Sequence, residues 1–122
     1  MPIIRLETNV KQSAILNLDA LMTQLSGTIA KVLGKPESYV NIIVVPDVAM
    51  IFGGSPDPCG CVNVISIGKL GVDENIIIAK EIYPILEEHL GIKGDRCYIK
   101  FEDVDRANIG YNGTTFHGLL KK

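Results

Sequence analysis

The first two residues, Met1 and Pro2, are where the sequence first points to chemistry. A small second residue allows methionine aminopeptidase to remove Met1, which would expose the Pro2 nitrogen as a free secondary amine. An ordinary α-amine titrates near ~7.7 to 8.0, and burial or a nearby cation lowers its pKa. Because the apolar run that follows predicts a strand, this amine would be held in place by structure. Pro2 is therefore a candidate acid–base catalyst, unless Met1 is retained and the Pro2 nitrogen stays an amide.

Lys35 is the second candidate, because it leaves the end of a predicted helix between Gly34 and Pro36. Near Pro2, its ammonium would lower the pKa of the amine and could hold a substrate carboxylate. A solvated surface lysine is the alternative interpretation of Lys35 when it is considered alone.

Four aromatic residues lie at the ends of predicted strands in a chain that has no tryptophan. They are Tyr39, Tyr98, Tyr111 and Phe116. Packing in the core is the ordinary role of such residues.

Metal and nucleotide sites are not indicated. The two histidines, His89 and His117, lie far apart, and neither has a second ligand at a useful spacing. Gly53-Gly54-Ser55 lacks the lysine and helix that follow a phosphate-binding loop. We therefore expect no metal and no cofactor. The three cysteines, Cys59, Cys61 and Cys97, are expected to be reduced, since their number is odd and Cys59-Gly60-Cys61 is too tight for an easy disulfide.

The elements that must position these residues follow from hydrophobic periodicity. An apolar run to Thr8 predicts a strand that starts almost at the N-terminus. Apolar residues spaced by three and four predict a helix over 13–33, which Gly34 ends. The β-branched stretch from Tyr39 to Val45 predicts a second strand. Residues 46–60 are rich in turn formers and predict a structured loop.

The second half of the chain repeats this order. Residues 61–67 predict a strand, and Asp73 is expected to cap a helix that ends at Gly91 and contains a discordant Pro84. Residues 97–102 predict a fourth strand, and residues 109–116 predict a hairpin or a pair of short strands. Lys121-Lys122 is expected to be solvated.

The chain also resembles itself weakly. Leu33-Gly34-Lys35 before Tyr39-Val40 recurs as Leu90-Gly91 and Lys93 before Cys97-Tyr98. Two pseudo-symmetric β-α-β units predict an α+β fold, a four-stranded mixed sheet with both helices on one face. The second and third predicted strands nevertheless carry apolar residues at both odd and even positions, so we expect the bare face to be covered by association.

The size and charge of the chain limit the number of domains and the classes of binding partner. A chain of 122 residues with 47% hydrophobic residues predicts one domain over 1–122, with 117–122 as a C-terminal tail that either lies near the site mouth or is disordered. Twelve basic against fourteen acidic residues favour neither nucleic acid nor membranes. No signal peptide or spanning segment is evident, so we expect a cytoplasmic protein, with secretion without a signal peptide left open.

Together these segments resemble macrophage migration inhibitory factor and its tautomerase relatives, including D-dopachrome tautomerase. The matching pieces occur in order over nearly the whole chain. They are Met1-Pro2, Thr8-Asn9-Val10, Gly34-Lys35-Pro36 with Tyr39, Val45-Pro46-Asp47, Phe52-Gly53-Gly54-Ser55, Ser66-Ile67-Gly68, Asp95-Arg96 before Tyr98-Ile99, and Asn112-Gly113-Thr114-Thr115-Phe116.

The resemblance implies a homotrimer with its sheets around the threefold axis and its active sites between subunits. It implies an isomerase that interconverts keto and enol forms of small aromatic acids such as phenylpyruvate without a cofactor. By position, Pro2 would move the proton, and Lys35 with the backbone of Ile67 would hold the substrate's oxygens. Tyr98 would come from the neighbouring subunit. The remaining lining would consist of Ile3 beside the amine and of Tyr39, Ile109, Tyr111 and Phe116.

Three departures from the family pattern are evident. Lys100 stands where well-known members have asparagine next to the substrate, so it would add a cation and favour acidic substrates. Tyr111 stands where tryptophan is common. Cys59-Gly60-Cys61 with Val62 replaces a Cys-x-x-Cys motif, which argues against a thiol oxidoreductase. The alternative function is a cytokine-like signalling protein that binds a receptor and keeps a vestigial tautomerase pocket.

Overall fold

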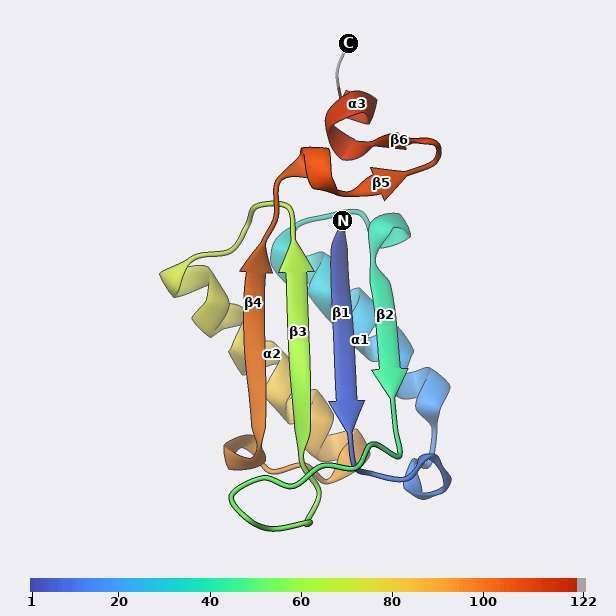
Figure 1. The fold of residues 1–122 in the computed structure, drawn as a ribbon, viewed down its shortest axis with the longest axis vertical. Coiled ribbons are helices and arrows are strands. Elements are labelled where there is room, and N and C mark those ends of the chain that lie inside the picture. Colours follow the sequence, from blue (N-terminus) through green and yellow to red (C-terminus); the bar gives the residue numbers. More distant parts are fainter. Residues whose placement is uncertain (121–122) are drawn as a thin grey trace.

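One four-stranded sheet and two long helices form the body of the protein (Figure 1). The structure is a computed structural model that describes residues 1–120, so the prediction for Lys121-Lys122 lies outside the described residues. The strands and helices are β1 (Pro2–Thr8), α1 (Leu18–Leu33), β2 (Asn41–Val45), β3 (Gly60–Ser66), α2 (Val72–Leu90), β4 (Cys97–Asp103), β5 (Gly110–Tyr111), β6 (Thr114–Thr115) and α3 (Phe116–Leu120). Short 3-10 turns occupy Gln12–Ala14, Glu37–Tyr39, Gly94–Arg96 and Arg106–Asn108.

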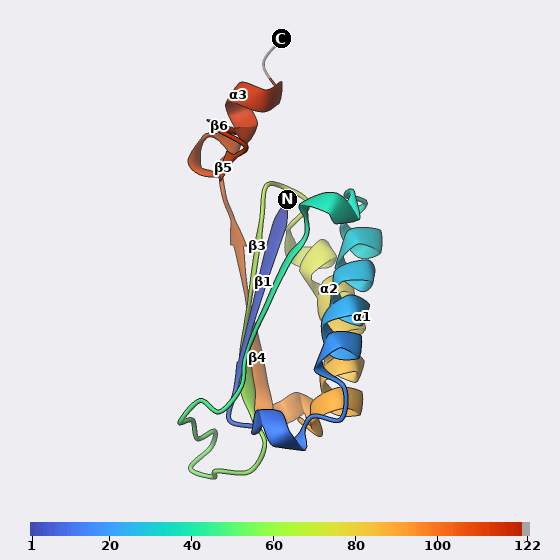
Figure 2. The same ribbon diagram turned by 90° about the vertical axis from the view of Figure 1, so that its right-hand side faces the viewer.

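The sheet has the order β2-β1-β3-β4. β1 is parallel to β2 and β3 is parallel to β4, while the two central strands, β1 and β3, are antiparallel. Each half of the chain is thus one β-α-β unit, and both crossover helices lie on the same face of the sheet (Figure 2). The predicted α+β fold with two repeated units is confirmed.

The core lies between the sheet and the two helices. Alternate residues of the central strands point into it, so Ile4, Leu6, Val62 and Val64 are almost fully buried. One face of each helix meets them. Its buried members are Leu21, Leu25, Ile29 and Leu33 in α1 and Ile78, Ile82, Ile85, Leu86 and Leu90 in α2. Each such side chain stabilises the fold by about 1.5 to 3 kcal/mol when fully buried.

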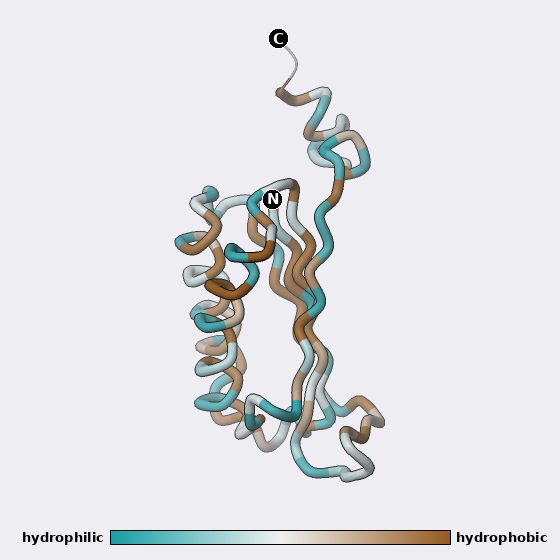
Figure 3. The backbone as a smooth tube through the Cα atoms, turned by 90° about the vertical axis from the view of Figure 1, so that its left-hand side faces the viewer, coloured by the Kyte–Doolittle hydropathy of each residue, from teal (hydrophilic) through white to brown (hydrophobic). Residues whose placement is uncertain are grey.

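The other face of the sheet has no helix over it in the described chain. The strands are largely hydrophobic in Figure 3, and the alternation that buries Ile4 directs Ile3 and Arg5 to this open face. Strand register places Ile43 and Ile65 beside them, and both are half-buried. Apolar side chains therefore occur on both faces, as the sequence predicted.

Helix α1 begins at Leu18, so the prediction of a helix from residue 13 is wrong at its start. Residues Gln12–Ala14 form a 3-10 turn, and Ile15 is buried from an extended conformation. The Asn17 side chain then accepts a hydrogen bond of 2.9 Å from the Ala20 N–H and caps the helix. Gly34, in the left-handed conformation with φ of 63°, ends it as predicted.

Smaller corrections concern the starts of β2 and α2. Tyr39 lies in a 3-10 turn instead of the strand, because its N–H bonds the Pro36 carbonyl at 3.1 Å. The N-cap of α2 is Gly71, and Asp73 lies inside the first turn, where its charge favours the helix dipole. Pro84 lies on the exposed side of α2, which continues to Leu90.

Hydrogen bonds between two side chains and the backbone of the loop order the segment between β2 and β3, as expected. The Arg96 guanidinium group donates to the carbonyl oxygens of Phe52, Ser55, Asp57 and Pro58 at 3.0 to 3.1 Å. The Asn9 amide donates to the carbonyls of Pro56 at 2.9 Å and Asp57 at 3.1 Å, and its oxygen accepts from the Cys59 N–H at 2.9 Å. At this end of the sheet the polar groups of the loop are therefore paired within the chain, and we call it the closed end.

Candidate active site

Pro2 is the first residue of β1 and is buried at the middle of the sheet. It pairs with Ser66 of β3, and Met1 before it is only 7% exposed. Ile3, the next residue of β1, pairs with both β2 and β3, so Pro2 begins a strand that has a neighbour on each side. The prediction that a strand begins at Pro2 is confirmed.

The Lys35 ammonium group lies next to the peptide bond that joins Met1 to Pro2. Lys35 follows the glycine cap of α1, and its N–H bonds the Ala30 carbonyl at 3.0 Å. Its Nζ donates to the Ile67 carbonyl at 2.5 Å, to Ser66 Oγ at 3.2 Å and to the Met1 carbonyl at 3.5 Å. The end of α1, the end of β3 and the N-terminus thus converge on one cation.

Burial and charge act together on the two amines of this site. Burial lowers the pKa of the N-terminal amine below its ordinary value of 8.0, and the charge of Lys35 lowers it further. Burial also lowers the pKa of Lys35, as does the charge of Lys69, while Asp103 opposes that shift. The N-terminal amine in this structure is that of Met1, so the lowered pKa belongs to the Met1 amine, one residue before Pro2.

Met1 occupies the space in front of Pro2 and marks where a ligand would lie. Its carbonyl oxygen accepts a hydrogen bond from the Lys35 ammonium group. Met1 also lines two adjoining cavities of about 280 and 250 Å³. Removal of Met1 would leave the Pro2 nitrogen as the amine between Lys35 and these cavities.

Three aromatic rings form one wall of these cavities. The ring centroids of Tyr39 and Tyr111 are 5.3 Å apart, and those of Tyr39 and Phe116 are 5.4 Å apart, both edge to face. Tyr111 and Phe116 stack at 5.4 Å. Ile3 and Ile109 also line the larger cavity, and Ile67 lines the smaller one. All but two of the predicted site residues thus lie together.

The exceptions, Tyr98 and Lys100, lie away from this site within one chain. Tyr98 is 70% exposed and pairs with Cys61 near the opposite end of β3, where its ring meets that of Phe52 at 5.0 Å. Along β4, Tyr98 lies five residues, or about 16 Å, before the residue that is level with Pro2. Lys100 is exposed opposite Asn63. The family resemblance implied that Tyr98 comes from a neighbouring subunit, and this stays a prediction.

Sequence reasoning missed two polar residues that hold the site. Ser66 is fully buried, accepts a hydrogen bond from Lys35 and donates to the Gly68 carbonyl at 2.8 Å. Asp103 accepts from the Gly68 N–H at 2.9 Å and so fixes the turn that carries the Ile67 carbonyl. Their roles depend on the register between β3 and β4, for which the sequence offered no signal.

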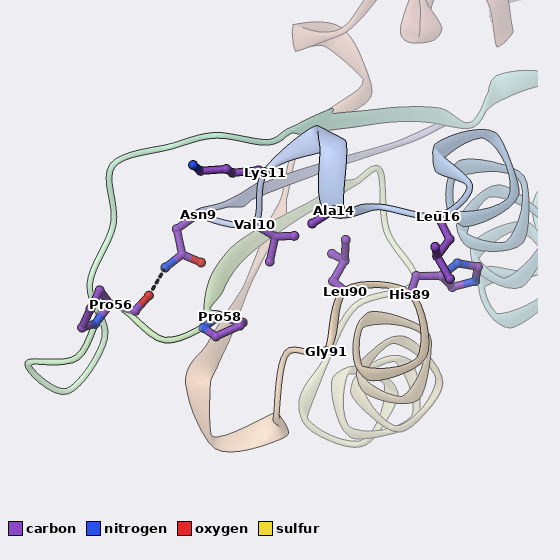
Figure 4. A pocket seen from close by; sticks show the side chains of 10 residues that line it. All are labelled: Asn9, Val10, Lys11, Ala14, Leu16, Pro56, Pro58, His89, Leu90 and Gly91. Carbon is purple, nitrogen blue, oxygen red and sulfur yellow. Dashed lines mark hydrogen bonds between the residues drawn. The ribbon is translucent and has the colours of Figure 1, made fainter.

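A cavity of about 450 Å³ lies at the opposite end of the sheet and lacks convergent polar groups (Figure 4). The side-chain amide of Asn9, on the wall of this cavity, is already hydrogen-bonded to the neighbouring loop. The His89 ring is hydrogen-bonded to the Gln24 side chain at 2.7 Å. Within residues 1–120 no group of three or more His, Cys, Asp or Glu side chains could hold a metal ion. None of the described helices is long and apolar enough to cross a membrane.

The three cysteines are free thiols, as predicted. Cys59 and Cys97 are buried. Burial, together with smaller contributions from the neighbouring Cys61 and Cys59, raises the pKa of Cys97 from 9.0 to about 12. Cys97 is thus held as an unreactive thiol at pH 7.

Comparison with known proteins agrees with this arrangement. The family model described as "Macrophage migration inhibitory factor (MIF)" matches residues 1–117. A macrophage migration inhibitory factor homolog of Brugia malayi is 42% identical over 116 residues, which cover 95% of this chain and 99% of that protein. The macrophage migration inhibitory factor of Xenopus laevis is 40% identical with the same coverage. The crystal structure of a homologue from Prochlorococcus marinus has a TM-score of 0.88 and 36% identity, and covers 93% of this chain and 98% of that one. The chain therefore belongs to the macrophage migration inhibitory factor family.

Proposed function

We propose that the protein is a cofactor-independent keto–enol tautomerase of small aromatic 2-oxo acids such as phenylpyruvate, with the Pro2 amine as acid–base catalyst. The observation that carries this proposal is the position of Lys35 Nζ, which meets the Met1 carbonyl, Ser66 Oγ and the Ile67 carbonyl beside the Pro2 nitrogen. An amine of lowered pKa, a cation and an aromatic wall are what this reaction needs.

The reaction moves one proton between carbon and oxygen. In the keto-to-enol direction, the uncharged Pro2 nitrogen takes a proton from carbon 3 of the substrate, and the electron pair moves to the ketone oxygen as an enolate. Lys35 stabilises that negative charge, and the Pro2 ammonium then gives its proton to the enolate oxygen, which completes the enol and restores the uncharged amine. In the reverse direction the Pro2 amine takes the hydroxyl proton of the enol and delivers it to carbon 3. The aromatic wall of Tyr39, Tyr111 and Phe116 holds the substrate's ring and excludes water.

The proposal includes a homotrimer whose sheets surround the threefold axis. The open face carries half-buried Ile43 and Ile65, which association would remove from water. In this assembly Tyr98 and Lys100 of one subunit reach the Pro2 cleft of the next. Lys100 then brings a second cation to the mouth of the cleft.

Replacing Pro2 tests the proposal directly. We expect Pro2→Gly to lower kcat/KM for phenylpyruvate by roughly 10²- to 10⁴-fold, the usual contribution of a general acid–base group. The matched control inserts one alanine before Pro2, which keeps every side chain and turns the Pro2 nitrogen into an amide. It should be equally inactive. Intact mass must first establish that Met1 is removed, and unchanged activity in either folded variant would contradict the mechanism.

Receptor binding is the second candidate function, and the names that the relatives carry support it. In a cytokine-like protein the surface would do the biological work and the cleft would be vestigial. This alternative predicts partner binding that survives Pro2→Gly, measured on the same protein that has lost tautomerase activity.

A further inference from the structure

Helix α3 extends past the part of the chain that matches the family model. The match ends at residue 117, whereas α3 spans Phe116–Leu120. With β5 and β6, α3 stands beyond the end of the main sheet where the N-terminus lies (Figures 1 and 2). Leu119 and Leu120 are therefore features of this chain that lie outside the matched residues and beside the candidate active site.

Two kinds of contact set the position of α3. Its first residue, Phe116, is buried, and its ring packs on those of Tyr39 and Tyr111. The Gly118 N–H donates to Thr115 Oγ1 at 3.0 Å, and a Cβ on Gly118 would clash with Thr114 Oγ1. The aromatic wall of the cleft and the direction of α3 are thus fixed together.

The two leucines at the end of α3 line the 250 Å³ cavity together with Met1 and Lys35. Leu119 is half-buried, and Leu120 is 60% exposed. An apolar ligand in front of Pro2 would remove both leucines from water, which favours its binding. A second carboxylate placed against them would lose its hydration without gaining a partner, which disfavours a doubly charged ligand.

We infer that Leu119 and Leu120 are specificity-determining residues, which form an apolar wall selecting 2-oxo acids with an aryl or alkyl substituent over dicarboxylates. The inference rests on the proposed tautomerase function. Lys35 satisfies one substrate carboxylate or enolate oxygen, and the leucines receive the hydrocarbon part. In the proposed trimer Lys100 of a neighbour acts in the opposite direction, so the contribution of the wall is measured with Lys100 unchanged.

Leucine truncation tests the wall. Leu119→Ala, Leu120→Ala and the double variant are compared with Leu16→Ala, which truncates a fully exposed leucine at the opposite end of the sheet. Values of kcat and KM are measured for phenylpyruvate and for the enol of oxaloacetate. We expect the double variant to lower the phenylpyruvate-to-oxaloacetate ratio of kcat/KM roughly 10-fold, mainly through KM for phenylpyruvate, with no change in Leu16→Ala. Leu119→Lys should raise activity toward oxaloacetate.

The outcomes separate this inference from the proposed function. An active unaltered protein whose substrate ratio survives the double truncation overturns the wall and leaves the tautomerase in place. An inactive unaltered protein contradicts the tautomerase, and the wall is then tested by calorimetric binding of 3-phenylpropanoate and succinate. Loss of preference for 3-phenylpropanoate in the double variant supports the wall, and an unchanged preference overturns it.

Discussion

At one end of the sheet Arg96 donates hydrogen bonds to four backbone carbonyls, whereas at the other end Lys35 is shared among oxygens that border open cavities. Both are cations held by carbonyl groups. Arg96 is committed entirely to a loop of its own chain, whose carbonyl groups it pairs, and the cavity at that end lacks, among residues 1–120, a cation shared in this way. Lys35 instead lowers the pKa of the nearby Met1 amine and lines a cavity of about 250 Å³. The same interaction stabilises structure at one end and prepares chemistry at the other.

Removing Lys35 should break this contrast most strongly. We expect Lys35→Ala to lower kcat/KM about 10²- to 10³-fold, because the enolate loses its stabilising charge. Loss of the cation also removes one cause of the lowered amine pKa, so the pH at which activity reaches half its maximum should rise. Lys31→Ala, which removes an exposed lysine of α1, is the control and should retain full activity. Equal losses in both variants would contradict a specific role for Lys35.

The next largest effect is expected at the closed end. Arg96→Ala removes one donor from each of the carbonyls of Phe52, Ser55, Asp57 and Pro58 and leaves that of Pro58 without a donor in the described part of the chain, so we expect the free energy of unfolding to fall by about 2 to 3 kcal/mol. Arg96→Lys keeps the charge but cannot reach all four oxygens, and it should recover only part of that loss. Urea unfolding measures both variants. A change below about 0.5 kcal/mol, typical of a surface substitution, would show that the loop does not depend on Arg96.

The repeated units could be predicted because their signals are local. The spacing of Leu21, Leu25 and Ile29 and the glycines at positions 34 and 91 define each helix and its end without reference to the rest of the chain. The start of α1 could not be predicted in this way. Ile15 continues the helical spacing and is buried, but it reaches the core from an extended segment.

The candidate site shows the same division. Pro2 and Lys35 are marked in the sequence by the chain start and by the glycine that ends a helix. The support from Ser66 and Asp103 arises from the pairing of β3 with β4, and the place of Leu119 arises from the packing of α3. Such neighbours are set by tertiary structure, which periodicity does not encode.

The two ends should also differ in how pH affects stability, the smallest of the expected effects at pH 7. At the site end the folded state lowers the pKa of the amine below 8.0, so the unfolded chain binds more protons and stability rises as pH increases toward 8.0. At the closed end Cys97, opposite Gly60, has its pKa raised from 9.0 to about 12. There the folded chain binds more protons, and stability falls as pH rises from about 9 to 12.

Urea unfolding of Cys97→Ala at pH 8 to 11 isolates that second contribution. Other groups titrate in both proteins, so the difference between their slopes belongs to Cys97, with an upper limit of about 1.4 kcal/mol per pH unit. We expect the unaltered protein to lose stability more steeply than the variant above pH 9, whatever the variant's stability at pH 7. Parallel slopes would mean that the Cys97 thiolate is as well solvated in the folded chain as in the unfolded one. The closed end would then admit water, and the contrast with the open cleft at Lys35 would rest on hydrogen bonding alone.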